Sequence, residues 1–219
     1  MPDWAGPVLA YAAEGLGRTA LLSAISIAAS IVAGIVLGSL LTVPVGIVRL
    51  PVRAYVEVWR GLPIIITLFF VFFALPAMNI RLSAFAAACL GLSLWASANV
   101  AEIVRGAVQS IHTGQFQAAR ALGFNWLQTM AYVVLPQSVR RMLPPLVSFL
   151  ANLIQCTSLA AIIGGFELLQ SARRSIERLT VETGSSEAIP ILAAVMLMYF
   201  LLCFPLAQVA RRMEASLAG

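Results

Sequence analysis

The chain has 219 residues, of which 61% are hydrophobic and 11% are charged. A soluble globular domain is about half apolar and about one quarter charged, so this composition excludes a soluble fold and predicts a single domain that lies in lipid. The formal net charge is +5, and every basic side chain is Arg. Because a phosphate-binding loop of the GxxxxGK[ST] type needs a Lys, the chain cannot supply that ATP site itself.

Five long windows without charged residues divide the chain, and each has about the 20 residues that a helix needs to cross ~30 Å of hydrocarbon. A helix satisfies its own backbone hydrogen bonds in lipid, whereas an open strand cannot, and the windows lack the alternation of a barrel strand. We therefore expect an all-α integral membrane protein with about five transmembrane helices. The predicted spans cover approximately residues 19–43, 54–76, 82–105, 136–163 and 188–210.

The distribution of Arg residues predicts the orientation of these spans, because cytoplasmic loops are enriched in positive charge. An odd number of spans places the two termini on opposite sides of the membrane. With the C-terminus in the cytoplasm, most Arg residues gather on that side, so we expect the N-terminus outside. The predicted cytoplasmic Arg residues are Arg49, Arg53, Arg105, Arg120, Arg140, Arg141, Arg211 and Arg212.

Charged residues near the ends of the second and third spans are candidates for function or for helix packing. Glu57 and Arg60 lie early in the second span, near the cytoplasmic interface, where an Arg side chain can snorkel to water. Glu102 and Arg105 are three residues apart at the end of the third span. We interpret them as a structural ion pair rather than a transport site.

The connection over about residues 106–135 is polar and is predicted to lie in the cytoplasm as two short helices. Residues 116–122 are predicted to form the first helix, and Gly123 can end it in a left-handed conformation. Asn125 then opens a second helix, with Gln128 three residues later as the partner in a capping box. This pattern predicts an elbow between the third and fourth spans.

The connection over about residues 164–187 is expected on the outer side and contains an amphipathic helix. Apolar residues at helical spacing share one face between Phe166 and Leu179. Such a helix could lie on the membrane surface. Its mixed charges favour a docking face for a binding protein, and the candidate docking residues are Glu167, Arg173, Arg174 and Glu177.

The cytoplasmic elbow carries a spaced pattern of Gln117-Ala118-Ala119, three residues, Gly123, nine residues, and then Val133-Val134-Leu135-Pro136. This pattern resembles the Glu-Ala-Ala loop of the transmembrane subunits of bacterial ABC importers, and the spacing matches throughout. The resemblance implies a loop that docks into a groove of a cytoplasmic ABC ATPase, which would bind ATP and Mg²⁺. The implied coupling residues are Gln115, Gln117, Ala118, Ala119, Gly123, Leu135 and Pro136.

Further stretches resemble one branch of this family, the permeases for polar amino acids of the histidine, glutamine, arginine and glutamate type. Residues 55–63, YVEVWRGLP, resemble its Y-x-E-x-x-R-G-x-P stretch, and residues 101–106, AEIVRG, resemble its AE[IV]xRG stretch. The matches cover about residues 55–170. They imply a type I importer permease in the bacterial inner membrane. The implied partners are a second permease subunit, identical or different, and an extracytoplasmic amino-acid-binding protein.

Three positions depart from the family pattern. Gln117 stands where Glu is usual, so a neutral hydrogen bond replaces a charged contact with the ATPase, and docking should survive. Gln155 and Cys156 stand where Lys and Asp are frequent. Either this subunit is the non-binding half of a heterodimer, or its substrate needs polar rather than charged contacts.

The residues of a tentative substrate path follow from the same resemblance. They are Glu57, Arg60, Asn152, Gln155, Cys156, Thr157 and Ser158. Hydrogen bonding between helices is an equal alternative for the polar residues of the fourth span. Pro144 and Pro145 are expected to bend or break that span, either as a plain kink or where freed backbone lines a cavity.

The sequence predicts no catalytic or metal-binding residues in this chain. His112 is the single His, and the three Cys residues are far apart in apolar surroundings. An ion-coupled secondary carrier is an alternative, but it needs an ionisable or unwound site at mid-membrane and usually internal repeats. A non-transporting scaffold would not need the spaced loop. The sequence therefore favours a subunit of an ATP-driven amino-acid importer.

Overall fold

The computed structural model describes residues 4–218, and the side chains of residues 4–215, and all regular structure in this range is helical. This confirms the predicted all-α fold. The α-helices are α1 (Ala5–Leu41), α2 (Gly46–Gly61), α3 (Ile64–Phe69), α4 (Ala84–Gln109), α5 (Thr113–Ala121), α6 (Trp126–Gln128), α7 (Leu135–Cys156), α8 (Leu168–Thr183) and α9 (Ala188–Ala218). Segments of π-helix (Phe70–Ala74, Thr129–Val134) and 3-10 helix (Leu75–Met78, Thr157–Ile163) adjoin α3 and α7.

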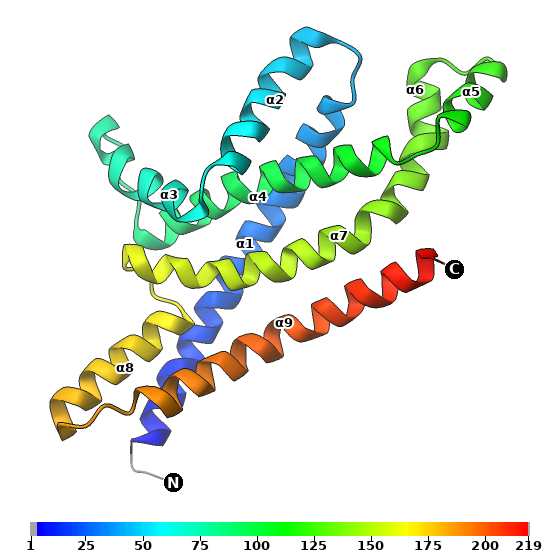
Figure 1. Ribbon diagram of the computed structural model, residues 1–219. Helices are drawn as coiled ribbons and strands as arrows, with labels where there is room; N and C mark the ends of the chain where they lie inside the picture. The colour runs from blue at the N-terminus through cyan, green and yellow to red at the C-terminus, as the bar shows by residue number, and fades with distance from the viewer. Residues whose placement is uncertain (1–3, 219) are drawn as a thin grey trace.

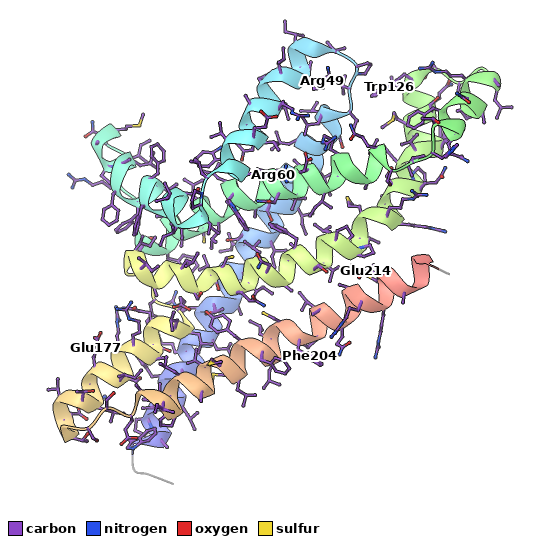
Figure 2. All side chains as sticks on the ribbon, viewed as in Figure 1. Arg49, Arg60, Trp126, Glu177, Phe204 and Glu214 are labelled. Carbon is purple, nitrogen blue, oxygen red and sulfur yellow. The ribbon has the colours of Figure 1, made fainter. Side chains whose placement is uncertain are left out.

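The long helices form a bundle whose two ends carry different short helices. α4, α7 and α9 run side by side, and α1 crosses them at a steep inclination (Figure 1). The α5–α6 elbow lies at one end of the bundle and α8 lies at the other. Trp126 and Glu177 mark these two ends in Figure 2. Four helical stretches of the described chain are long and apolar enough to cross a membrane, namely Ala5–Leu41, Ala84–Gln109, Trp126–Ile163 and Ala188–Ala215.

A bent pair of helices replaces the single straight span predicted over residues 54–76. α2 and the stretch Ile64–Met78 meet at an angle of 105°. Leu62 between them has an extended backbone, with ψ 137°, and Pro63 follows it. A residue before Pro is pushed out of the helical conformation, so α2 must end there. If the bent pair crosses the membrane as one unit, the described residues hold five spans.

Two other helices differ from the pattern expected from the sequence. α1 begins at Ala5, where the predicted span began at residue 19, and its 37 residues extend over about 55 Å. That length exceeds the ~30 Å of hydrocarbon, so a helix this long must tilt in the bilayer or extend beyond the hydrocarbon. Pro144 and Pro145 do not break the fourth span, because α7 continues through both of them. The helix α7 lacks only the two backbone N–H donors that Pro144 and Pro145 cannot supply.

Small residues allow the backbone of α1 to come into direct contact with neighbouring helices. A Cβ atom at Gly34 would lie 2.4 Å from the Cβ of Val100 on α4. Lipid offers little hydrophobic drive for helix association, so close van der Waals contact between small residues has to supply it. The buried small residues of α1 are Ala12, Gly15, Thr19, Ser23, Ser26, Ser30, Gly34 and Gly38.

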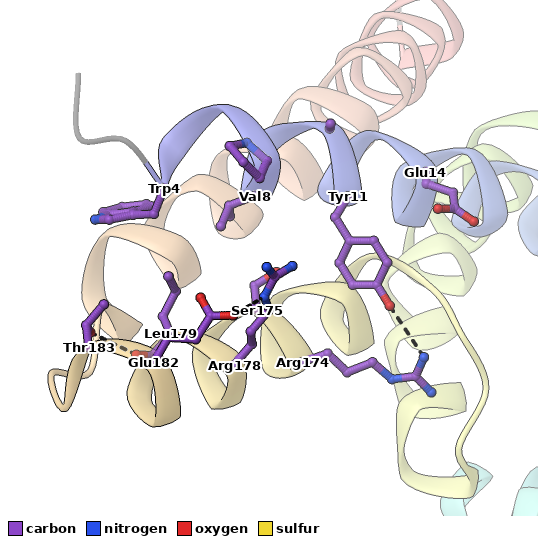
Figure 3. A pocket seen from close by; sticks show the side chains of 12 residues that line it. Trp4, Val8, Tyr11, Glu14, Arg174, Ser175, Arg178, Leu179, Glu182 and Thr183 are labelled. Carbon is purple, nitrogen blue, oxygen red and sulfur yellow. Dashed lines mark hydrogen bonds and ion pairs between the residues drawn. The ribbon is translucent and has the colours of Figure 1, made fainter.

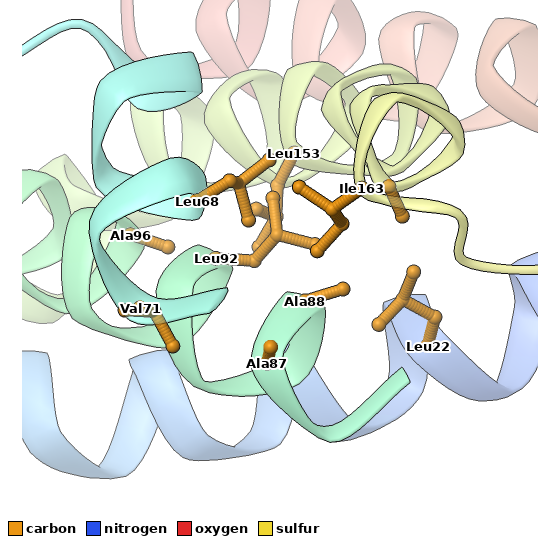
Figure 4. Packing of buried hydrophobic residues seen from close by; sticks show 10 residues of the cluster. Leu22, Leu68, Val71, Ala87, Ala88, Leu92, Ala96, Leu153 and Ile163 are labelled. Atoms are coloured by element: carbon orange, nitrogen blue, oxygen red, sulfur yellow. The ribbon is translucent and has the colours of Figure 1, made fainter. Parts of the chain in front are cut away.

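Large apolar side chains fill the space beside this contact. Leu22 of α1, Leu68 of α3, Leu92 of α4 and Leu153 of α7 are each at most 1% exposed and belong to one cluster (Figure 4). Ile163, at the end of the 3-10 segment after α7, belongs to the same cluster. Because lipid supplies little hydrophobic drive, the many close van der Waals contacts among these side chains hold the cluster together. The cluster therefore fixes the broken second span against α4 and α7.

Replacing Gly34 by Ala should destabilise the contact between α1 and α4, because the added methyl group has no room beside Val100. Overpacking of this kind costs about 1–3 kcal/mol. The matched control is Gly17→Ala in the same helix, where a Cβ would meet no atom within 4 Å. That control should be neutral or stabilising by about 1 kcal/mol. Thermal unfolding in detergent measures both variants, and equal melting temperatures would contradict the tight contact.

Candidate coupling loop and transport path

The predicted elbow has the local geometry that its sequence indicated. Gly123 follows α5 with φ +81°, a left-handed conformation that residues with a side chain rarely adopt. Its N–H donates to the carbonyl oxygen of Arg120 at 2.9 Å, and the N–H of Phe124 donates to Ala119 at 3.0 Å. Asn125 and Gln128 form the reciprocal capping box, with both hydrogen bonds at 2.9 Å. These observations confirm the helix–glycine–helix prediction.

Buried contacts hold the elbow to the ends of α4 and α7. Val108 and Ile111 pack against Met130 and Val134 in a small apolar cluster, with Phe116 beside it. Polar contacts add to this cluster across the same junction. The Gln137 side-chain amide donates to Gln115 at 3.2 Å, and Arg141 donates to the carbonyl oxygen of Ser110 at 2.6 Å. The elbow is therefore fixed to both helices that lead into the bundle.

The tip of the elbow carries apolar side chains that nothing in the described chain covers. Leu122 is 76% exposed, Leu127 is 70% exposed and Tyr132 is 72% exposed. Apolar residues in an otherwise polar loop are a signal for a docking surface, and the spaced loop pattern did not include these three residues. Of the predicted coupling residues, Ala119 is buried, whereas Gln115, Gln117, Ala118, Gly123, Leu135 and Pro136 are exposed.

One face of α7 presents polar side chains away from the bundle core. Asn152 and Gln155 are exposed there, and Cys156 and Ser158 are half-buried. Thr157 differs, because it is fully buried and its hydroxyl donates to the carbonyl oxygen of Ile154 at 2.6 Å. Its predicted place on a substrate path is therefore corrected to a structural one. The remaining four residues, three at the end of α7 and Ser158 in the 3-10 segment that follows it, form a neutral polar stripe, which we name the polar stripe of α7.

Glu57 and Arg60 belong to a separate charged cluster between α2 and α4. Glu57 pairs with Arg53 on its own helix at 2.6 Å. Arg60 reaches across to Glu102 at 3.6 Å, and Glu102 also accepts from Arg105 at 2.8 Å, which confirms the predicted ion pair. No hydrogen bond or ion pair of the described residues joins this cluster to the polar stripe of α7. The structure therefore does not unite the two parts of the tentative path.

Glu167 is a buried structural residue and not part of an exposed docking face. Its side chain is 0% exposed and accepts from the N–H groups of Leu169 at 2.8 Å and Gln170 at 2.7 Å, so it caps α8. The Tyr199 hydroxyl of α9 also donates to it at 2.7 Å. Burial raises the pKa of the Glu167 carboxyl, and these donors oppose that rise. Because its partners come from two helices, Glu167 ties α8 to α9.

The remaining docking candidates lie on the outside of α8. Arg173 and Glu177 are exposed and point away from the helix neighbours, since the buried face of α8 consists of Leu168, Ser171, Ala172, Ser175 and Leu179. This buried face confirms the predicted amphipathic helix. Arg174 instead turns back to α1, where its guanidinium meets the Tyr11 hydroxyl at 3.4 Å.

Comparison with known proteins relates the whole bundle to one transport family. Residues 30–218 match the family described as binding-protein-dependent transport system inner membrane component. The glutamine transport system permease protein of Escherichia coli is 36% identical over 97% of this chain and 96% of its own length. The probable glutamine ABC transporter permease protein of Bacillus subtilis is 37% identical over 94% and 93%. A crystal structure of an amino acid ABC transporter with histidines shares the fold, with a TM-score of 0.86, 23% identity, and 99% of both chains covered.

Replacing Glu167 by Gln should destabilise the outer end of the bundle, because an amide cannot accept from all three donors at once. A buried donor left without a partner costs about 1–3 kcal/mol. Glu177→Gln on the same helix is the matched control, since this side chain is exposed. Thermal unfolding compares the two variants. A melting temperature for Glu167→Gln equal to that of the control would show that the buried carboxylate does not hold α8.

Proposed function

Since the chain belongs to the family of binding-protein-dependent transport system inner membrane components and is an amino-acid importer permease, we propose that it forms the translocation path of an ATP-driven importer for polar amino acids. The observation that carries this proposal is the family match over residues 30–218 together with the exposed elbow at one end of the bundle. In this proposal the chain lies in the bacterial inner membrane as a multi-pass subunit, with its N-terminus outside and its C-terminus in the cytoplasm.

The proposed coupling element is the elbow from Gln117 to Pro136. Its exposed tip offers the apolar area of Leu122, Leu127 and Tyr132 to a groove of a cytoplasmic ATPase, which binds ATP and Mg²⁺. The cluster of Val108, Ile111, Met130 and Val134 would carry a movement of the tip into α4 and α7. Gln117 is exposed on this surface and can give a neutral hydrogen bond where a Glu would give a charged one.

The proposed substrate path runs along the neutral polar stripe of α7. Asn152, Gln155, Cys156 and Ser158 would face a second permease subunit, identical or different, and the two stripes would enclose the path between them. Uncharged polar groups suit a polar amino acid without a formal side-chain charge, because a charge at mid-membrane requires a charged partner. Each state of the path must bind the amino acid with a different affinity for transport to follow.

The proposed docking face for the extracytoplasmic amino-acid-binding protein is the exposed side of α8. Arg173 and Glu177 lie there with opposite charges and no ion-pair partner among the described residues. Opposite charges on a surface orient an approaching partner and fix its register. The buried cap at Glu167 keeps this helix in a fixed position relative to α9.

Introducing charge at the tip of the elbow should release the ATPase. The double variant Leu122→Glu and Leu127→Glu is expected to lower the amount of co-purified ATPase about tenfold or more, since carboxylates would replace buried apolar contacts. Val181→Glu is the control, because Val181 is 86% exposed on α8 at the opposite end. Quantified pull-down of the complex measures the effect. Retention of the ATPase by the double variant at wild-type levels would contradict the docking assignment.

Removing the amide groups of the α7 stripe should impair transport without uncoupling the ATPase. Asn152→Leu and Gln155→Leu are each expected to lower uptake at low substrate concentration about fivefold, because each variant loses the binding free energy of one hydrogen bond. Gln208→Leu, which removes an amide from α9, serves as the control. Uptake of labelled amino acids and basal ATPase activity are measured in reconstituted vesicles with the binding protein present. Unchanged uptake in both stripe variants would argue that another subunit binds the substrate.

A further inference from the structure

A large open cleft separates the first part of α1 from α8, at the end of the molecule opposite the elbow. Its volume is about 940 Å³, and its walls belong only to these two helices (Figure 3). Trp4 lies near one end of the cleft, and Tyr11 and Arg174 lie toward the other. None of its lining residues has a place in the proposed substrate path or in the elbow. The cleft is thus a separate feature of the fold.

One part of the cleft holds a cation and an anion that no described residue neutralises. The Arg174 guanidinium donates to the Tyr11 hydroxyl at 3.4 Å and lies 5.6 Å from the ring centre of Phe166. Tyr11 and Phe166 pack against each other with ring centres 5.1 Å apart, so the guanidinium is held in place. Glu14 lines the same cleft from α1. Neither Arg174 nor Glu14 belongs to an ion pair among the described residues.

The other part of the cleft is neutral and largely apolar. Arg178 and Glu182 neutralise each other there, with a separation of 2.7 Å. Trp4, Val8 and Leu179 supply the apolar walls. A second, largely apolar hollow of about 120 Å³ adjoins the cleft, reaches the beginning of α9, and shares Trp4, Val8 and Ser175 with it. The cleft therefore has a charged part and an apolar part, as a site for an amphiphile requires.

The position of the cleft relative to the membrane spans favours a lipid as this amphiphile. α9 begins beside it, and the first turn of α9 exposes Ile189 at 84%, which is typical of a surface in contact with acyl chains. Trp4 and Tyr11 have the amphipathic rings that gather at the boundary between hydrocarbon and water. In the proposed orientation, with the N-terminus outside, the cleft would lie at the depth of the outer-leaflet headgroups, so this inference rests on the proposed function.

We propose that this cleft binds one phospholipid of the outer leaflet whose headgroup carries a phosphate and a primary ammonium. The phosphate accepts hydrogen bonds from the Arg174 guanidinium, whose planar donors match phosphate oxygens. The primary ammonium donates to the Glu14 carboxylate. The glycerol and the upper acyl chain lie along Trp4, Val8 and Leu179. A free amino acid or a soluble headgroup would leave this apolar part unfilled, so the whole lipid is the better fit.

The test is lipid binding by the purified complex after delipidation, measured by native mass spectrometry. Phosphatidylethanolamine, phosphatidylcholine and phosphatidylglycerol with the same acyl chains are titrated separately, together with soluble glycerophosphoethanolamine. The ethanolamine lipid should bind at least about fivefold more tightly than the other two lipids, because choline has no N–H donor and phosphatidylglycerol has no ammonium. The soluble headgroup should bind far more weakly than the lipid. Equal binding of all three lipids, a preference for phosphatidylglycerol, or equal binding of the soluble headgroup would overturn the proposal.

Two variants locate the lipid in this cleft. Arg174→Gln should weaken binding of the ethanolamine lipid about tenfold, whereas Arg173→Gln, an exposed neighbour that does not line the cleft, should leave it unchanged. Glu14→Gln should remove the preference for ethanolamine over choline while binding persists. Glu14 is exposed and has no ion pair among the described residues, so this variant should fold normally. Equal effects of Arg174→Gln and Arg173→Gln, or an unchanged preference in Glu14→Gln, would place the lipid elsewhere.

Discussion

The close approach of α1 to α4 and α8 is the constraint on which the rest of the structure depends. At Gly34 and Gly38 the backbone of α1 comes so near α4 that a Cβ would lie within 2.6 Å of its atoms, and at Gly15 it comes equally near Ser171 of α8. Helices in lipid associate through such van der Waals contact, because the acyl chains are as apolar as the side chains. A wider separation would leave the central apolar cluster unfilled.

This constraint connects the two ends of the molecule. α4 leads directly into the elbow, and α8 forms the opposite end of the molecule. Because α1 packs against both helices, it links the two ends. Thr19 of α1 accepts a hydrogen bond from the N–H of Leu168 at 3.0 Å, directly beside the buried Glu167 cap. In the proposed transport cycle, a movement of the elbow therefore reaches α8 through packed helices rather than through a flexible linker.

Local features could be predicted from the sequence, and features that join distant residues could not. Gly123 and the Asn125–Gln128 capping box are encoded within a few positions, and the structure has both. The burial of Glu167 depends on Tyr199, which is 32 residues away, so its charge alone indicated an exposed residue. The bend at Pro63 was not predicted, because an uncharged window does not separate a straight span from a bent one.

The proposed coupling requires the elbow to lie in the cytoplasm, because an ATPase can reach it only there. In a variant without Cys89, Cys156 and Cys203, single Leu122→Cys and Val181→Cys substitutions are labelled in intact spheroplasts with a membrane-impermeant maleimide. Val181→Cys should be labelled immediately, and Leu122→Cys only after permeabilisation. Labelling of Leu122→Cys in intact spheroplasts would contradict the cytoplasmic location of the elbow.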